Sequence, residues 1–281
     1  MRHEQMQSEL KEYGGWLVHR EYSPATIEKY THVLSRFFQE SRLEGEPTKE
    51  DVAAWRDGLA RSGYSAASVN AMLAAVNGYQ EFRERPQEKA KPLKRQRRAF
   101  REEKRELSRE EYMRLLDAAR DSGSKRTLLL LQTLCATGIR VSELRFITVE
   151  AVCRGRARIQ CKGKCREILL PTALCKRLKR WCGKQHIHSG PVFLSRRGNP
   201  LDRVTVWKLM KALCSAARVA WEKVFPHNLR HLFAQTFYKM ERDLSKLADL
   251  LGHSSIETTR IYIMESGAEH QRLLDRMHLL L

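Results

Sequence analysis

The sequence lacks any apolar run of the roughly 18–20 residues that a membrane-spanning helix requires, and it has neither internal repeats nor low-complexity tracts. Its first residues, MRHEQMQSELKEY, are too polar for a secretory leader. Acidic residues are also scarce, because 33 Asp and Glu stand against 52 Lys and Arg in a chain of 281 residues. We therefore expect a cytoplasmic protein of one large domain or two modest ones, each with its own core.

The cysteines point neither to disulfides nor to a metal site. They are odd in number, and no CxxC pair or nearby histidine accompanies Cys161 and Cys165, which bracket a short turn. Structural zinc takes four Cys or His ligands, and His227 with His231 lacks the glutamate of the HExxH zinc motif. The sequence therefore predicts reduced thiols, no bound metal and no cofactor. The seven cysteines are Cys135, Cys153, Cys161, Cys165, Cys175, Cys182 and Cys214.

The positive charge is large, with a formal net charge of +19 and a pI near 9.9. An excess of this size favours a polyanionic partner, of which nucleic acid is the commonest. Charge alone leaves open a ribosome-associated protein or a merely very soluble one. An anionic membrane surface is less favoured, because no long basic amphipathic helix leads the chain.

Residues 1–88 have the pattern of successive helices. Ser23 and Pro24 make a good N-cap and first-turn pair, Thr48 opens a capping box, and Ser65 precedes a further helix. Apolar residues recur behind each of these starts at helical spacing. The segment is therefore predicted to be a small helical bundle.

A basic linker is predicted at residues 89–106. Its sequence KAKPLKRQRRAFREEKR carries nine Lys or Arg against two Glu and has no apolar stripe that a core could hold. Two interpretations stay open: a solvated spacer, or a strap along DNA phosphates through Lys94, Arg95, Arg97 and Arg98.

Residues 107–281 are predicted to be mostly helical with one small antiparallel sheet. The apolar segment TLLLLQTLCATG has the character of a buried helix that ends at Gly138. Around residues 156–170 the pattern becomes strand-like and predicts a β-hairpin with its tip at Lys162–Lys164. The fold class is thus mainly α, with an α+β second domain.

Four short segments in this second domain carry side chains suited to chemistry at a phosphate: ATGIRVSEL, CKGKCRE, HNLRH and LGHSSIETTRIY. The Arg and Glu of the first segment are three residues apart, just beyond a helix that ends at a glycine. The first His and the Arg of the third segment are also three residues apart, which puts them on one face of a helix. In order, the segments supply Arg140 with Glu143, Lys162, His227 with Arg230, and His253 with Tyr262.

These segments resemble those of the tyrosine recombinases, the phage-integrase-type family that includes the Xer resolvases, lambda integrase and Cre. That family's catalytic set runs Arg, Lys, His-x-x-Arg, His or Trp, and Tyr, and Glu143 falls where the family often places an acid. The lysine has two candidates, because Lys164 follows Lys162 in the same turn. The matching residues are Arg140, Lys162, His227, Arg230, His253 and Tyr262.

The resemblance covers nearly the whole chain and implies its organisation. Residues 1–88 would be a SAM-like core-binding domain and residues 107–281 the catalytic domain, with double-stranded DNA held between them. The implied activity is site-specific DNA recombination, as integration, excision or dimer resolution, through a 3′-phosphotyrosyl intermediate. Neither ATP nor a divalent metal is needed, because the energy of the broken bond is kept in the intermediate.

The chemistry of phosphodiester transesterification requires the same types of side chain. Transesterification at a phosphodiester needs a nucleophile, here Tyr262, and cations against the charge of the phosphorane, here Arg140 and Arg230. A tyrosine hydroxyl with an ordinary pKa near 10 needs a base, and His227 suits that role. Lys162 would protonate the leaving 5′ oxygen.

Two further residues complete the expected site. His253 would donate a hydrogen bond to a nonbridging phosphate oxygen, and Glu143 would brace the arginine and histidine side chains. Each of these residues taken singly has an ordinary structural interpretation, so the prediction depends on six residue types in one order within a +19 chain.

Two rival functions and one assembly remain to be tested. A type IB topoisomerase uses much the same chemistry to relax supercoils, and a DNA-binding relative with a dead site would keep the fold without activity. At residues 268–281 an apolar stripe at helical spacing needs a groove to cover it, either in its own domain or, as the family resemblance implies, in a neighbouring protomer of a tetrameric synapse. The sequence names neither the DNA site nor the choice between integrase and resolvase.

Overall fold

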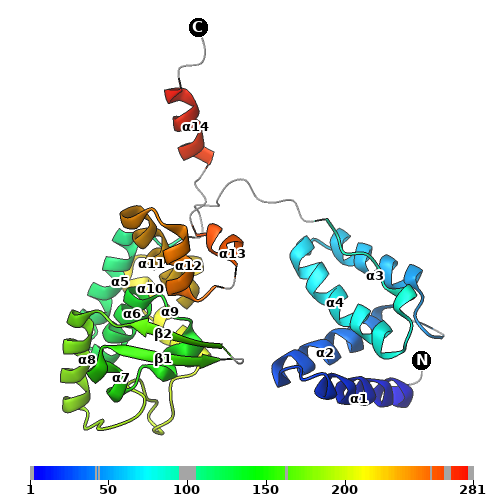
Figure 1. Cartoon of the computed structure of the whole chain (residues 1–281), viewed down its shortest axis with the longest axis horizontal. Coiled ribbons are helices and arrows are strands. Elements are labelled where there is room, and N and C mark those ends of the chain that lie inside the picture. Colours follow the sequence, from blue (N-terminus) through cyan, green and yellow to red (C-terminus); the bar gives the residue numbers. More distant parts are fainter. Residues whose placement is uncertain are drawn as a thin grey trace. The chain divides into compact units, whose positions relative to one another are not determined.

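The computed structural model describes residues 3–41, 43, 45–94, 106–161, 164–253, 255–262 and 267–277. The chain divides into two compact units between residues 97 and 98, within the predicted linker (Figure 1). Among the described residues, no helix is long and apolar enough to cross a membrane. Each unit has its own buried core.

The first unit is a bundle of helices whose starts follow the predicted caps. Thr48 and Asp51 form the reciprocal capping box at the start of α3, and the Ser65 side chain accepts a hydrogen bond from a backbone N–H at the start of α4. Phe37 and Tyr79 are among the largest side chains buried between these helices. The elements are α1 (His3–His19), α2 (Pro24–Ser41), α3 (Lys49–Arg61), α4 (Ala66–Phe82) and the 3₁₀ turn η1 (Pro86–Glu88).

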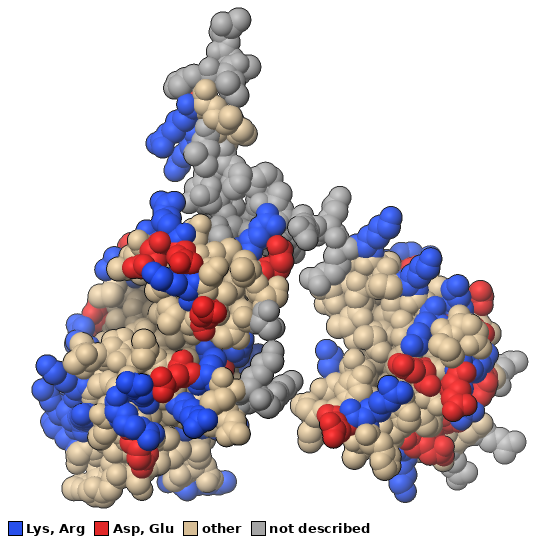
Figure 2. Space-filling view, in the orientation of Figure 1, with Lys and Arg blue, Asp and Glu red and all other residues tan. Residues whose placement is uncertain are grey.

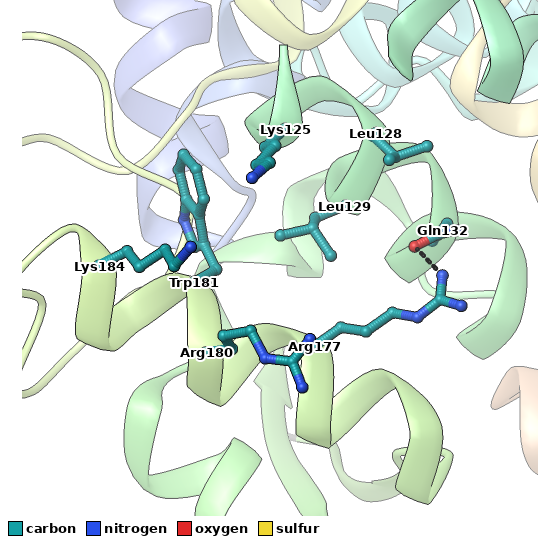
Figure 3. A pocket seen from close by; sticks show the side chains of 8 residues that line it. All are labelled: Lys125, Leu128, Leu129, Gln132, Arg177, Arg180, Trp181 and Lys184. Carbon is teal, nitrogen blue, oxygen red and sulfur yellow. Dashed lines mark hydrogen bonds between the residues drawn. The ribbon is translucent and has the colours of Figure 1, made fainter. Parts of the chain in front are cut away.

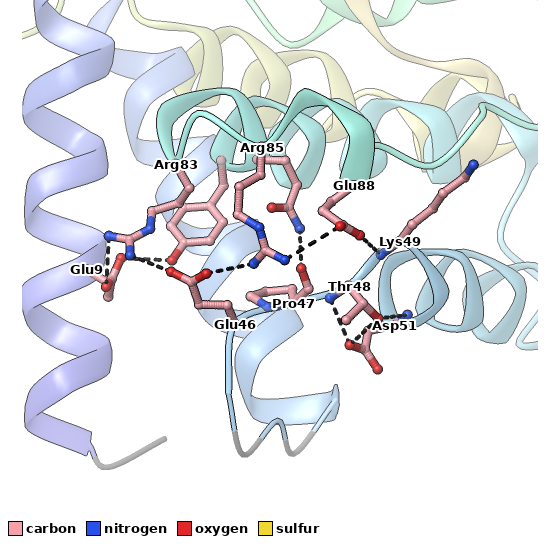
Figure 4. A network of polar contacts seen from close by, with 11 residues as sticks. Glu9, Glu46, Pro47, Thr48, Lys49, Asp51, Arg83, Arg85 and Glu88 are labelled. Atoms are coloured by element: carbon pink, nitrogen blue, oxygen red, sulfur yellow. Dashed lines mark hydrogen bonds and ion pairs between the residues drawn. The ribbon is translucent and has the colours of Figure 1, made fainter.

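A polar network ties the segment before α3 to the end of α4 (Figure 4). The Glu46 carboxylate accepts from Arg83 Nη2 at 2.6 Å and from Arg85 Nη1 at 2.8 Å. In the same network, the buried side-chain amide of Gln80 donates a hydrogen bond to the backbone carbonyl of Pro47 at 2.9 Å. Exposed ion pairs contribute little by themselves, so the buried amide is the stronger constraint on this segment.

The first residues of the predicted linker pack on α4. Asn77 exchanges two hydrogen bonds with the backbone of Ala90, at 3.0 and 3.1 Å. Asn70 does the same with Leu93, at 2.9 and 2.8 Å. Ala90 is 3% exposed, so this stretch belongs to the core of the first unit. The solvated or DNA-bound character predicted for the linker therefore applies only beyond it, from Lys94 onward.

The second unit is built around α6, which packs against α5, α8, α9 and α11. The predicted buried helix ends at Gly138, where φ is +60° and an added Cβ would lie 2.4 Å from Cδ1 of Phe233. Only glycine tolerates both conditions. The helices of this unit are α5 (Arg109–Asp121), α6 (Lys125–Thr137), α7 (Val149–Arg154), α8 (Thr172–Lys184), α9 (Arg203–Lys211), α10 (Cys214–Ala217), α11 (Pro226–Glu241), α12 (Leu244–Leu251), α13 (Ile256–Arg260) and α14 (Gly267–Arg276), with the 3₁₀ turns η3 (Val141–Phe146) and η4 (Trp221–Lys223).

The predicted hairpin is present as strands β1 (Arg156–Cys161) and β2 (Lys164–Leu169), paired antiparallel from Arg156↔Leu169 to Cys161↔Lys164. Ala157, Ile159 and Ile168 are buried on its inner face. The prediction of a mainly helical chain with one small antiparallel sheet is therefore confirmed.

Candidate active site

Arg230 lies at the centre of the candidate site and is only 2% exposed. It comes from the second turn of α11, and its guanidinium donates to the carbonyl of Gly138 at 2.6 Å and to that of Leu251 at 2.8 Å. These carbonyls stand at the C-terminal ends of α6 and α12, where a helix carries partial negative charge. Burial, and the charge of the nearby Arg140, lower the pKa of Arg230.

His253 accepts a third hydrogen bond from Arg230, from Nη2 to the ring Nε2 at 2.8 Å. A guanidinium has donors only, so Nε2 is unprotonated and the ring proton is on Nδ1, which donates to Thr259 Oγ1 at 2.8 Å. Burial and the cations Arg230, Arg140 and Arg166 lower the pKa of His253 to about 4. Without DNA the ring is therefore neutral near pH 7 and has no free N–H for a phosphate.

This arrangement predicts that acid destabilises the fold through His253. Its folded-state pKa of about 4 lies below the ordinary value of 6.5. Between these two values His253 is therefore protonated in the unfolded chain but neutral in the folded protein. The stabilisation is complete above about pH 6.5 and is lost as pH falls toward 4. The pKa of His227 is lowered too, first by desolvation, and acts in the same direction.

Urea unfolding measured from about pH 7.5 down to about pH 4 tests this prediction. The variant His253→Gln should show a shallower fall in the free energy of unfolding than the parent chain. His188→Gln, at an exposed histidine away from the site, should leave the slope unchanged. Equal slopes for the parent and His253→Gln would contradict the prediction.

Tyr262 follows α13 and is 2% exposed. Its ring stacks on His253, with centroids 5.7 Å apart and planes at 10°, and lies 5.8 Å from the ring of His227. A hydrogen bond between Tyr262 and Arg230 partly opposes the lowering of the Arg230 pKa that burial and Arg140 cause. The structure thus brings together four of the residues that the sequence predicted, from helix α11 and the segments around α13.

Arg140 and Glu143 frame the same site from η3. The Glu143 carboxylate, 4% exposed, accepts from the backbone N–H of Arg140 at 2.8 Å and from its Nη1 at 3.2 Å. The Arg140 side chain stays 45% exposed, so its guanidinium can reach a ligand. Its charge contributes to the lowered pKa values of His227 and His253, after burial and the charge of Arg230.

Arg166 was missed by the sequence reasoning. From β2 it donates to Glu143 Oε2 at 2.6 Å and to the carbonyl of Leu250 at 2.8 Å. It also packs against Gly252, where φ is +63° and a Cβ would lie 2.4 Å from Arg166 Cδ. The signal was available, because Arg166 shares the inward face of its strand with the buried Ile168, and a cation there needs a partner.

His231 was considered in the sequence only as a zinc ligand and set aside. Its ring is the nearest of the three histidine rings to Tyr262, at 4.6 Å and 66°. Its Nδ1 lies 3.8 Å from Oε1 of Glu106, whose other oxygen, Oε2, accepts a hydrogen bond from Gln235 Nε2 at 2.8 Å. The four-residue spacing from His227 puts both histidines on one face of α11. Within the described residues no group of three or more His, Cys, Asp or Glu could hold a metal ion.

Several predicted residues are not placed at the site. Lys162, Arg95, Arg97 and Arg98 lie outside the described residues. Lys164 begins β2, but its side chain is likewise outside them, and Lys94 is exposed at the end of the first unit.

Comparison with known families agrees with this arrangement. Residues 105–269 match the phage integrase family, and residues 10–87 match the phage integrase N-terminal SAM-like domain. The chain belongs to the phage integrase family, the class of tyrosine-type site-specific recombinases. The family assignment made from the four motif segments is therefore confirmed.

Individual relatives support the same class, and solved structures share the fold. The chain is 32% identical to tyrosine recombinase XerA of Pyrococcus furiosus, over 100% of this chain and 98% of the relative, and 30% identical to tyrosine recombinase XerD of Halalkalibacterium halodurans, over 87% and 88%. In fold it is similar to a lambda integrase dimer bound to a core site, with a TM-score of 0.70, 22% identity and coverage of 93% and 96%. A post-cleavage complex of XerH recombinase also has a TM-score of 0.70, with 21% identity and coverage of 92% and 81%.

Proposed function

We propose that this protein cuts and rejoins DNA at specific sites, with Tyr262 as the nucleophile. The observation that carries the proposal is the convergence of Arg230, His227 and His253 on Tyr262, with Arg140 acting by its charge on the pKa values of the same groups. Attack by the tyrosine hydroxyl forms a phosphotyrosyl bond to the 3′ side and releases a 5′ hydroxyl. A partner strand's 5′ hydroxyl then attacks that bond, so the number of phosphoester bonds is unchanged.

The side chains divide the work by charge and protonation. Arg140 and Arg230 carry the guanidinium groups that neutralise the phosphorane oxygens. His227, whose lowered pKa keeps it neutral near pH 7, accepts the Tyr262 proton. Lys162 protonates the leaving 5′ oxygen.

His253 must gain a proton on Nε2 before that nitrogen can donate a hydrogen bond to a phosphate. In the DNA-free site its Nε2 accepts from Arg230, and neighbouring cations oppose its protonation. A phosphate between Arg140 and Arg230 supplies the opposite charge and raises the pKa again. We propose that DNA binding itself protonates His253 and turns it toward a nonbridging oxygen.

Positioning and backbone contacts complete the proposal. Glu143 holds Arg140 and Arg166, which fixes the first catalytic arginine against β2. Lys94, Lys164 and the arginines at 95, 97 and 98 would contact DNA phosphates, where they add affinity but no sequence specificity. The site of action would be cytoplasmic DNA.

The experiment that tests the function recovers DNA covalently attached to the protein from denatured cells. We expect fragments that share one short sequence and end at a 3′ phosphate linked to Tyr262. Two duplexes carrying that sequence should give Holliday junctions when mixed with the protein. Relaxation of plasmids without junctions would instead indicate the topoisomerase reaction, and absence of any adduct would indicate a DNA-binding relative without activity. Neither the relatives nor the structures favour those rivals.

Assembly through the C-terminal helix is part of the proposal. Leu274 on α14 is 60% exposed, and Met277, the residue after this helix, is 54% exposed. An apolar face of this kind is normally covered. One solved relative is a lambda integrase tetramer on a Holliday junction. We propose that residues 268–281 dock on a neighbouring protomer and so couple the Tyr262 sites within a synapse.

Removing residues 268–281 should leave binding to a single site nearly intact but abolish cooperative synapsis and strand exchange. The double variant Leu274→Ser with Met277→Ser should do the same, because it removes only the apolar contact. Gln271→Ser with Arg272→Ser, at exposed polar positions of the same helix, is the matched control. A truncated protein that melts early as a monomer would show that the helix packs in its own domain.

A further inference from the structure

A pocket lies between α6 and α8, with a volume of about 260 Å³ (Figure 3). Its apolar lining comes from Leu128, Leu129 and Trp181, and Gln132 lies at one side. Four cations complete the wall: Lys125, Arg177, Arg180 and Lys184. No acidic side chain is among the lining residues.

The cations of this pocket are available to a ligand. None of the four forms an ion pair with a residue that the structure describes, and Arg177 only donates to Gln132 Oε1 at 3.1 Å, a bond that orients its guanidinium. The sequence of α8, TALCKRLKRWCGK, holds five Lys or Arg and no Asp or Glu. Figure 2 shows the resulting cluster of Lys and Arg at the lower left, where Figure 1 places α8.

Trp181 contributes apolar surface to the pocket rather than a hydrogen-bonding group. Its indole Nε1 is buried and has no partner among the described residues, so a ligand in the pocket does not reach it. The apolar lining and the four cations together therefore call for a ligand that combines an apolar body with negative charge.

The pocket is separate from the catalytic residues. Its lining comes from the first part of α6, whereas Arg230 contacts Gly138 beyond the other end of that helix. Along α6 the distance to Gly138 is about 20 Å from Lys125 and about 9 Å from Gln132. A ligand in the pocket thus has no direct contact with Tyr262.

We infer that this pocket binds an acidic segment of another protein. A bulky apolar side chain of the segment packs on Leu128, Leu129 and Trp181, and flanking carboxylates pair with the cations of the rim. Charge complementarity selects this occupant: residues 268–281 of a second copy hold two Arg against two acidic residues and do not match the rim. A DNA backbone is anionic throughout and would leave the apolar floor unfilled.

The test uses a fluorescent synthetic peptide with Leu and Phe between runs of Glu, and follows its anisotropy on binding to the full chain. Arg177→Glu with Arg180→Glu should weaken binding on the order of tenfold or more. The matched control is Lys176→Glu with Lys179→Glu, which changes the charge of α8 equally at exposed positions that do not line the pocket. It should weaken binding much less.

Three results would overturn the inference. The first is equal loss in the two double variants, which would mean attraction to the whole helix. The second is equal binding of a peptide in which Ser replaces Leu and Phe, which would remove the role of the apolar floor. The third is an equal loss of affinity for nonspecific duplex DNA in Arg177→Glu with Arg180→Glu, which would make the surface a DNA contact. Thermal melting confirms that each variant is folded, and Leu128→Ser supplies an independent variant with unchanged charge.

Discussion

Tyr262→Phe is expected to abolish the covalent protein–DNA adduct completely while DNA binding survives. The substitution removes only the hydroxyl. The ring that stacks on His253 and contacts His231 stays in place, so the surrounding site keeps its packing. The hydrogen bond to Arg230 is lost, but Arg230 keeps its bonds to Gly138 and Leu251.

Adduct formation is measured on a nicked duplex that carries the recombination site, by mobility of the denatured protein, with binding measured on the same duplex. Tyr238→Phe is the matched control, because Tyr238 belongs to the same small apolar cluster on α11 and has no assigned role. It should form the adduct at the parental rate. Adduct formation by Tyr262→Phe would mean that another residue attacks the phosphate, and the proposed function would fail.

Lys162→Ala is expected to slow strand cleavage by roughly 10²–10⁴, the usual contribution of a general acid. The reason is specific to the leaving group, because a 5′ alkoxide is a poor leaving group until it is protonated. A substrate with sulfur at the 5′ bridging position departs without a proton. Cleavage of that substrate by Lys162→Ala should therefore be close to the parental rate.

Lys164→Ala is the comparison, since it is the other lysine of the same turn. It should cleave the ordinary substrate at nearly the parental rate and gain little from the sulfur. If the sulfur rescues Lys164→Ala and not Lys162→Ala, the general acid is Lys164. A chelator should change neither rate, and strong inhibition would point to a metal ion in the reaction.

Much of the fold follows from local signals. The capping residues Thr48 and Ser65 start helices where the pattern predicts them, because their side chains satisfy backbone N–H groups three residues away. Gly138 ends α6 because the turn there needs a positive φ. These features depend on neighbours in sequence, so the sequence alone predicts them well.

The site is predicted less completely, since its supporting contacts join distant segments. The catalytic residues were found by their types and order. Arg166 and Thr259 lie within the motif segments but were not singled out, and Glu106 lies outside them. The partners of Arg166 and Glu106 are 23 and 129 residues away in the chain, and no local pattern predicts such pairings. The protonation state of His253 also had to come from the structure, because it depends on the side that Arg230 approaches.

The two hydrogen bonds that Arg230 donates to backbone carbonyls affect which residues this kind of protein can lose during evolution. Arg230 donates to carbonyls at the ends of α6 and α12 in addition to its proposed role at the phosphate, so losing it would leave two helix ends unsatisfied in the core. The hydroxyl of Tyr262 has no comparable role at the end of a helix. A descendant that gave up catalysis would be free to lose that hydroxyl first while still retaining the arginine. In such descendants the presence of the arginine would indicate only the shared fold. The presence of the tyrosine would indicate that the proposed reaction is retained.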